Sequence, residues 1–173
     1  GGHVLELAAG TGTWTGLLAE LFERVTALDA AAETLAINRA NVAAENVDYV
    51  HGDLYAYEPA APFDFIFFGF WISHVPAERF ERFWQLLEGW LKPGGRLFFI
   101  DGYYVANAES RRDEVLLHAE ETQGRDLSDG RVYEIVKRYY NPPKLQAQLG
   151  RLGWDVHVTH TPSFFLYGHG SRA

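Results

Sequence analysis

The stretch VLELAAGTGTWTG, residues 4–16, carries the residue types and spacing that point most directly to chemistry. A short apolar run contains the acid Glu6, the glycines Gly10 and Gly12 follow, and a helix-forming segment comes next. Because glycine has no side chain, a turn of this kind lets the backbone approach a ligand closely. The stretch therefore predicts a nucleotide-binding turn between a strand and a helix.

The spacing of the glycines separates the kinds of nucleotide that such a turn could bind. The dinucleotide fingerprint needs G-x-G-x-x-G, and here Gly16 comes one position too late. A P-loop needs a Gly-Lys-Ser/Thr sequence, which does not follow. These mismatches disfavour NAD and a phosphate cradle, and a tight turn without any ligand is the alternative interpretation.

The elements that must position this turn alternate along the first hundred residues. Strands are expected at residues 3–8, 25–29, 47–51, 63–68 and 96–101, and helices at 14–22, 31–44 and 76–91. The first helix is expected to present Leu17, Leu18, Leu21 and Phe22 on one face. Such alternation favours right-handed crossovers and a parallel sheet covered on both faces. The fold class is therefore α/β.

The C-terminal third changes character. A charged helix is expected at residues 107–122, a turn at 128–131, an extended segment at 132–140 and a hairpin of strands at 156–160 and 163–167. A helix at 142–152 has Asn141 as its N-cap and Pro142 at its first position. We see no linker or repeat, so one domain over residues 1–173 is expected. The chain lacks Met and its first strand begins by about His3, so a missing N-terminal segment or a removed initiator Met is also expected.

The bulk composition narrows the class of protein. The 173 residues are 47% hydrophobic and carry a net charge of −8, which suits a globular core and disfavours nucleic acid as a partner. Without cysteine, disulfides, thiolate zinc sites and cysteine nucleophiles are excluded. No apolar run approaches the ~18 residues of a membrane span, and no signal segment is seen. A cytoplasmic protein that associates with neither membrane nor nucleic acid is expected.

Five motifs in order resemble the class I S-adenosylmethionine-dependent methyltransferases. They are ELAAGTG at residues 6–12, TALDA with Asp29, HGDLY with Asp53, FDFIFFGFWISHVP at the fourth expected strand and LKPGGRLFFID leading into the fifth. Ala8 replaces the first glycine of the family's motif. The resemblance implies a Rossmann-like, doubly wound sheet in three α/β/α layers. That sheet would be mostly parallel, with an antiparallel last strand.

The resemblance implies a seat for S-adenosylmethionine (SAM). Asp29 would accept hydrogen bonds from both ribose hydroxyls and Asp53 from the adenine amino group, and carboxylates suit a cationic ligand without phosphates. The alternatives are that Asp29 caps the following helix and that Asp53 is a solvated turn residue. The expected cofactor-binding residues are Glu6, Ala8, Gly10, Thr11, Gly12, Asp29, Ala30, Asp53, Leu54, Gly69 and Phe70.

Segments after the fourth and fifth expected strands would bind the methyl acceptor. His74 is a candidate general base, and its alternative role is a hydrogen bond to the backbone. Aromatic walls suit a small organic acceptor, although these rings could equally be ordinary packing. Lys137, Arg138 or Arg131 could pair with an acidic acceptor. The expected substrate-pocket residues are Trp71, Tyr103, Tyr104 and Tyr140.

Two other kinds of methyltransferase fit less well. The sequence NPPK at residues 141–144 differs in position from the N-P-P-aromatic motif of adenine-amino methyltransferases, and Lys144 replaces the aromatic residue. The fourth expected strand ends without an acid that could bind a metal. His157 and His160 would lie on opposite faces of a strand, so no metal site is expected.

The sequence therefore predicts an enzyme that moves a methyl group from SAM to an oxygen or nitrogen atom of a small organic acceptor and releases S-adenosylhomocysteine (SAH). It is similar to bacterial members of the family whose substrates are described only in general terms. The resemblance names neither an acceptor nor an oligomeric state. A regulatory protein that binds SAM without turnover is the alternative, and a nicotinamide-dependent oxidoreductase is disfavoured by the glycine spacing.

Overall fold

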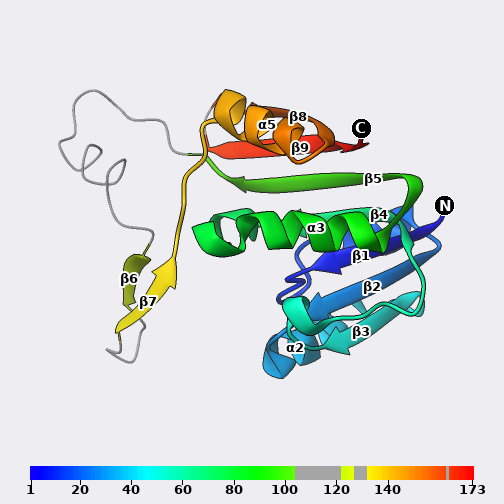
Figure 1. Ribbon diagram of the computed structural model, residues 1–173. Helices are drawn as coiled ribbons and strands as arrows, with labels where there is room; N and C mark the ends of the chain where they lie inside the picture. Colours follow the sequence, from blue (N-terminus) through cyan, green and yellow to red (C-terminus); the bar gives the residue numbers. More distant parts are fainter. Residues whose placement is uncertain (104–121, 127–131, 163) are drawn as a thin grey trace.

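A seven-stranded sheet organises the computed structural model of this chain, which describes residues 1–103, 122–126, 132–162 and 164–173 (Figure 1). The strand order is β3-β2-β1-β4-β5-β9-β8. Strands β1 to β5 run parallel, and β9 is antiparallel to both of its neighbours. The expected fold class, a mostly parallel sheet with a reversed last strand, is confirmed. The strands are β1 His3–Leu7, β2 Arg24–Asp29, β3 Val47–His51, β4 Phe63–Gly69, β5 Leu91–Gly102, β8 Trp154–His160 and β9 Phe165–Arg172.

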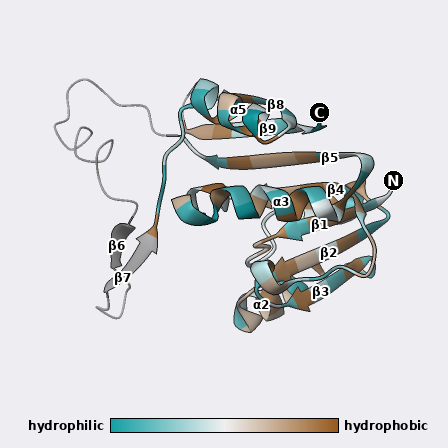
Figure 2. Cartoon of the chain, in the orientation of Figure 1, coloured by the Kyte–Doolittle hydropathy of each residue, from teal (hydrophilic) through white to brown (hydrophobic). Residues whose placement is uncertain are grey.

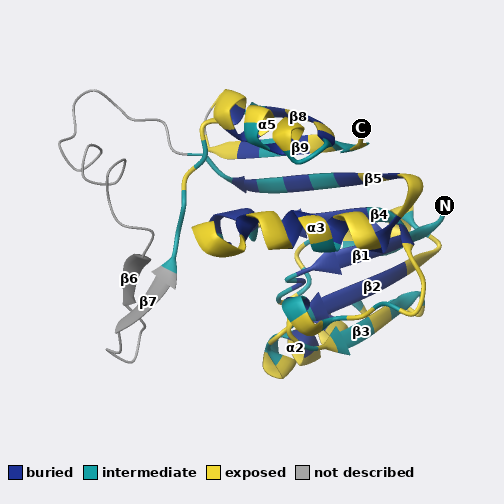
Figure 3. Cartoon of the chain, viewed as in Figure 1, coloured by how far each residue is buried: buried dark blue, intermediate teal, exposed yellow. Residues whose placement is uncertain are grey.

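Helices cover both faces of this sheet. On one face, Leu18 of α1 (Thr15–Leu21) packs on β1, β2 and β4, and Leu35 of α2 (Ala32–Val42) packs beside it on Ala27. On the other face, α3 (Phe80–Trp90) and α5 (Pro142–Arg151) bury their apolar sides in the main core. The central strands are accordingly hydrophobic and buried (Figures 2 and 3).

Two local predictions for the helices need correction. The α-helix expected from Pro76 begins at Phe80, because Ala77–Arg79 forms a 3-10 turn (η3) closed by a hydrogen bond from Arg79 N–H to the Pro76 carbonyl. In α1, Leu18 is buried, but Leu17 is 49% and Leu21 59% exposed. Residues four apart share a helix face, so Leu17 and Leu21 lie together beside the face that meets the sheet.

A small hairpin stands beyond the carboxyl ends of the central strands (Figure 1). It pairs β6 (Thr122–Asp126) with β7 (Val132–Val136) in antiparallel register. Strand β7 falls within the predicted extended segment, whereas β6 was not predicted and begins where the charged helix was expected to end. The remainder of that helix, the turn at 128–131, Tyr104 and Arg131 lie outside the described residues.

Helix α5 begins with the capping residues that the sequence predicts. The Asn141 side chain accepts a hydrogen bond from the backbone N–H of Lys144 at 3.2 Å, and proline occupies the first turn of α5. The predicted N-cap is therefore confirmed.

Further short 3-10 turns are η1 (Leu54–Ala56) and η2 (Ile72–His74). Among the helices that the structure describes, none is long and apolar enough to cross a membrane.

Candidate functional site

A cavity of about 110 Å³ opens where β1, β2 and β3 end. Parallel strands bring their carboxyl ends to one edge of the sheet, and ligands of open α/β sheets bind there. Two residues on its wall, Leu28 and Gly52, were not predicted as site residues, although they directly precede the predicted carboxylates Asp29 and Asp53 in the sequence. The cavity is lined by Ala8, Leu28, Asp29, Ala30, Gly52, Asp53, Leu54 and Trp71.

Asp29 joins the turn after β1 to the start of α2. Its Oδ2 accepts a hydrogen bond from the Gly10 N–H, and its Oδ1 accepts one from the Ala31 N–H, each at 2.8 Å. The Thr34 hydroxyl lies 3.3 Å from Oδ1, but its shorter contact, at 2.8 Å, is with the Ala31 carbonyl oxygen, which accepts its single hydrogen. A carboxylate offers about four acceptor positions, so this group has capacity for further donors from a ligand in the cavity.

Asp53 occupies the corresponding position after β3. Its Oδ1 accepts a hydrogen bond from the Tyr55 N–H at 2.9 Å and so caps the short η1 turn. This cap holds the exposed carboxylate beside the buried Leu54 on the cavity wall. Two carboxylates from neighbouring strand ends therefore face one small cavity.

The turn between β1 and α1 takes the left-handed conformation at several positions. Gly10 and Gly12 have φ values of 54° and 98°, and Ala8 has a φ of 52°. A Cβ atom on Gly12 would lie 2.7 Å from the Asn38 Oδ1 and 3.0 Å from the Val42 Cγ2. The sequence signal of paired glycines thus reflects both backbone conformation and close packing against α2.

Ala8→Gly is expected to stabilise the protein by about 0.5–1 kcal/mol. The left-handed conformation costs an L-residue roughly 1–2 kcal/mol, and the greater freedom of glycine in the unfolded chain offsets part of that gain. Chemical denaturation measures the change. The matched control is Ala9→Gly, since the neighbouring Ala9 is buried with an ordinary φ and its replacement is expected to destabilise. Equal losses in the two variants would contradict strain at Ala8.

Glu6 lies beneath the turn instead of on the cavity wall. The side chain is 1% exposed, and its Oε2 accepts a hydrogen bond of 2.6 Å from the Thr15 hydroxyl. Burial raises the pKa of Glu6 to about 7, although the bond from Thr15 partly opposes that rise. Glu6 was predicted to bind the cofactor, and in the structure its side chain is hydrogen-bonded within the protein, beneath the turn.

Three other predicted cofactor residues lie at the same edge but outside the cavity wall. Thr11 is exposed, and its carbonyl accepts a hydrogen bond from the Asn41 side chain. A Cβ atom on Gly69 would lie 2.6 Å from the Trp14 Nε1, so Gly69 makes room for that indole. Phe70 has a φ of 57°, is 42% exposed and packs edge-to-face on the Phe165 ring.

Trp71 was predicted for the substrate pocket, and the structure places it on the cavity wall shared with Asp29 and Asp53. Its indole Nε1 is buried and has no hydrogen-bond partner among the described residues. A buried N–H donor without a partner is costly, and a ligand in the cavity is one way to satisfy it. Trp71 thus forms the part of the cavity wall that comes from the segment after β4.

His74 is held by the segment that carries the hairpin. Its Nδ1 lies 2.6 Å from the Val136 carbonyl oxygen, and its backbone N–H donates to the Trp71 carbonyl. Because a carbonyl only accepts, Nδ1 carries the proton and Nε2 is the basic nitrogen of the neutral ring. This geometry agrees with the alternative role, a hydrogen bond to the backbone.

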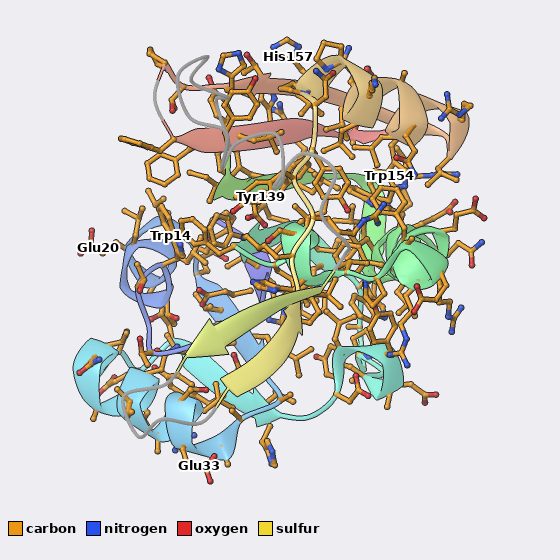
Figure 4. The ribbon with its side chains drawn as sticks, turned by 90° about the vertical axis from the view of Figure 1, so that its left-hand side faces the viewer. Trp14, Glu20, Glu33, Tyr139, Trp154 and His157 are labelled. Carbon is orange, nitrogen blue, oxygen red and sulfur yellow. The ribbon has the colours of Figure 1, made fainter. Side chains whose placement is uncertain are left out.

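The remaining acceptor candidates make contacts within the protein. The Tyr140 hydroxyl donates to the Ile72 carbonyl at 3.3 Å, and the Tyr103 ring stacks on His160 with centroids 4.3 Å apart. Neither tyrosine lines the cavity. Figure 4 views the carboxyl edge and shows the β6–β7 hairpin crossing in front of the strand ends, with Tyr139 above it.

The basic residues proposed for an acidic acceptor are also engaged. The Lys137 ammonium lies 3.2 Å from a carboxylate oxygen of Asp101, which is 1% exposed, and 2.7 Å from the Ser73 hydroxyl. Arg138 lies over the Tyr140 ring. Lys137 therefore compensates a buried charge at the end of β5 and ties the segment after β7 to η2.

Comparison with known proteins agrees with this geometry. The family described as a methyltransferase domain matches residues 4–95. Phosphoethanolamine N-methyltransferase 1 from Arabidopsis thaliana is 28% identical over 125 residues, which are 70% of this chain and 26% of that protein. The chain thus spans about a quarter of that curated relative's length.

Solved structures give closer similarity. DhpI in complex with SAH is 37% identical with a TM-score of 0.84, and the match covers 99% of this chain and 76% of that one. The DhpI complex with SAM and HEP is 38% identical with a TM-score of 0.85, covering 96% and 77%. The glycopeptide N-methyltransferase MtfA, 20% identical with a TM-score of 0.73 over 100% of this chain and 84% of its own, shows the fold alone.

The family match covers more than half of the chain, and DhpI is similar over nearly all of it. The sheet order and the reversed last strand agree with that assignment. This chain belongs to the methyltransferase domain family, among the class I SAM-dependent methyltransferases.

Proposed function

We propose that the protein transfers a methyl group from SAM to an oxygen or nitrogen atom of a small organic acceptor. The observation that carries the proposal is the cavity in which Asp29 and Asp53 meet beside the turn that contains Gly10 and Gly12. Solved DhpI structures with SAM and with SAH support the choice of cofactor and product. The activity is proposed for one domain over residues 1–173, in the cytoplasm and without nucleic acid or membrane as partners.

The residues around the cavity fit the chemistry of SAM. Asp29 is proposed to accept hydrogen bonds from the ribose hydroxyls and Asp53 from the adenine amino group. The apolar walls from Leu28, Leu54 and Trp71 suit a purine ring, and the unpartnered Trp71 Nε1 offers a donor. SAM supplies a methyl group on a sulfonium that already favours its transfer. The protein is then needed to orient the two reactants and exclude water.

A proton acceptor is needed only if the acceptor atom carries a proton. His74 is the proposed base for that case, because its Nδ1 is tied to Val136 and Nε2 is the basic nitrogen. The aromatic side chains Phe70, Phe165 and Tyr139, each partly exposed, are proposed to flank the acceptor. A small molecule with nitrogen as its acceptor atom is favoured by the match to a phosphoethanolamine N-methyltransferase.

Ligand titration followed by thermal or chemical unfolding tests the proposal. SAM or SAH at 100 times its dissociation constant is expected to stabilise the native state by about 2.7 kcal/mol, and NAD is expected to have no effect. Turnover with a panel of phenols, carboxylates and amines then separates an enzyme from a non-catalytic binder. Absence of any shift with SAM and SAH would overturn the cofactor assignment, and full activity of His74→Ala would remove the base.

A further inference from the structure

A buried line of hydrogen bonds runs beneath the glycine turn and joins β3, α2, α1 and β1. The Tyr49 hydroxyl donates to the Asn38 Oδ1 at 3.2 Å, the Asn38 Nδ2 donates to the Thr15 hydroxyl at 2.8 Å, and Thr15 donates to the Glu6 Oε2 at 2.6 Å. Every donor points toward the carboxylate. Hydrogen bonds aligned in this way polarise and strengthen one another.

Asn38 links this line to the turn itself. Its side chain is 0% exposed, and its Nδ2 also lies 3.2 Å from the Gly10 carbonyl oxygen and 3.4 Å from that of Ala9. Its Oδ1 sits where a Cβ atom on Gly12 would collide. One buried amide therefore supports the turn over residues 9–12, and the Nδ2 hydrogen that does not go to Thr15 would lose its partner if the turn moved.

Gly10 is held from both sides. Its N–H donates to Asp29 on the cavity side, and its carbonyl accepts from Asn38 on the α2 side. A shift of the Asn38 amide would therefore move the Gly10 peptide that orients Asp29. Asn38 on α2 is therefore connected to the cavity through the backbone of the turn. Neither Asn38 nor Thr15 lines the cavity itself.

We propose that Thr15 and Asn38 are positioning residues for the cofactor, acting through the conformation of residues 8–12. This inference rests on the proposed function, which seats SAM at that turn. The two residues contribute by preorganising the turn before the ligand arrives, so their loss weakens SAM and SAH binding while the chemical step at saturating SAM is retained.

A matched pair of variants at Thr15 tests the proposal. Thr15→Val keeps the shape and removes the hydroxyl, whereas Thr15→Ser keeps the hydroxyl. Calorimetric titration is expected to show SAM affinity about tenfold weaker in Thr15→Val, because the turn is no longer preorganised for the ligand, and little change in Thr15→Ser. KM for SAM should rise in Thr15→Val with kcat nearly constant. A merely structural role would lower the unfolding temperature and leave the Kd of the folded protein unchanged.

Two more variants keep the test decisive. Tyr49→Phe removes the first donor of the line at the partly exposed edge strand, where folding is less at risk, and a smaller loss of about threefold is expected. Asn46→Ala is the control, since the Asn46 amide donates to the Ala19 and Phe22 carbonyl oxygens and not to the turn over residues 8–12. Wild-type affinity in Thr15→Val, or in Tyr49→Phe should Thr15→Val not fold, would overturn the proposal.

Asp29→Ala separates this failure from failure of the proposed function. If Asp29→Ala loses SAM affinity while Thr15→Val binds normally, the cofactor seat stands and the positioning role is wrong. If both variants bind normally, the cofactor does not occupy this turn, and the two proposals fall together. The expected result is loss of affinity in both variants, with the larger loss at Asp29.

Discussion

Asp29→Ala is expected to weaken SAM binding roughly 100-fold or more. Two hydrogen bonds from the ribose to a charged acceptor would be lost, and each contributes about 1.5 kcal/mol or more. The same substitution removes the acceptors that hold the N–H groups of Gly10 and Ala31, so the turn also loses its link to the residue before α2. Direct contact and preorganisation of the turn are thus expected to fail together.

Calorimetric titration with SAM and SAH measures this loss, and the unfolding temperature without ligand reports the damage to the turn. Glu33→Ala is the matched control, because Glu33 is an exposed carboxylate on the first turn of α2 (Figure 4). Its removal changes the charge by the same amount nearby and should leave affinity unchanged. Asp29→Asn is expected to fall between wild type and Asp29→Ala, since an amide keeps one acceptor oxygen. Undiminished affinity in Asp29→Ala would disprove the ribose assignment.

Glu6→Gln is expected to remove a pH dependence of stability of about 3 kcal/mol. Burial raises the pKa of Glu6 from 4.5 to about 7 in the folded protein. Between these two pKa values the unfolded chain binds fewer protons than the native state, so stability falls as pH rises. The loss is complete above about pH 7, where the native carboxylate is ionised in a buried site.

Denaturant unfolding of wild type and Glu6→Gln at about pH 5, 6, 7 and 8 measures the difference. The difference in free energy of unfolding should shift in favour of Glu6→Gln as pH rises through this window and level off above it. Glu20→Gln, at an exposed carboxylate on α1, serves as the control and should parallel wild type (Figure 4). A constant difference between wild type and Glu6→Gln would show that Glu6 does not titrate with a raised pKa.

The positions of the first five strands along the chain could be predicted because their signals are local. The apolar run of β4 and the turn signals around β3 each depend on a few consecutive residues, and β3 was predicted with the bounds that the structure has. The positions of Asp29 and Asp53 at strand ends also follow from the sequence. Parallel strands end at one edge of the sheet, so residues 24 positions apart were expected to meet there.

Contacts between distant segments could not be predicted in the same way. Asn38 gave no signal, since an asparagine inside a helix usually faces solvent, and only the packing of α2 on the turn buries it. Lys137 was one of three basic residues considered as partners of an acidic acceptor, and the fold places its ammonium beside the buried Asp101. Such pairings depend on how the chain returns across the sheet edge.

The sequence by itself determined the family, the sheet, and the two carboxylates with their glycine turn, because each of these depends on short motifs in a fixed order. Only the tertiary structure decided that Trp71 lines the cavity beside Asp29 and Asp53, that Glu6 lies beneath the turn, and that the Tyr140 hydroxyl donates to the Ile72 carbonyl. Burial and hydrogen bonding belong to the whole packed chain. A side chain's type states what it is able to bind, and its neighbours in space decide what it does bind.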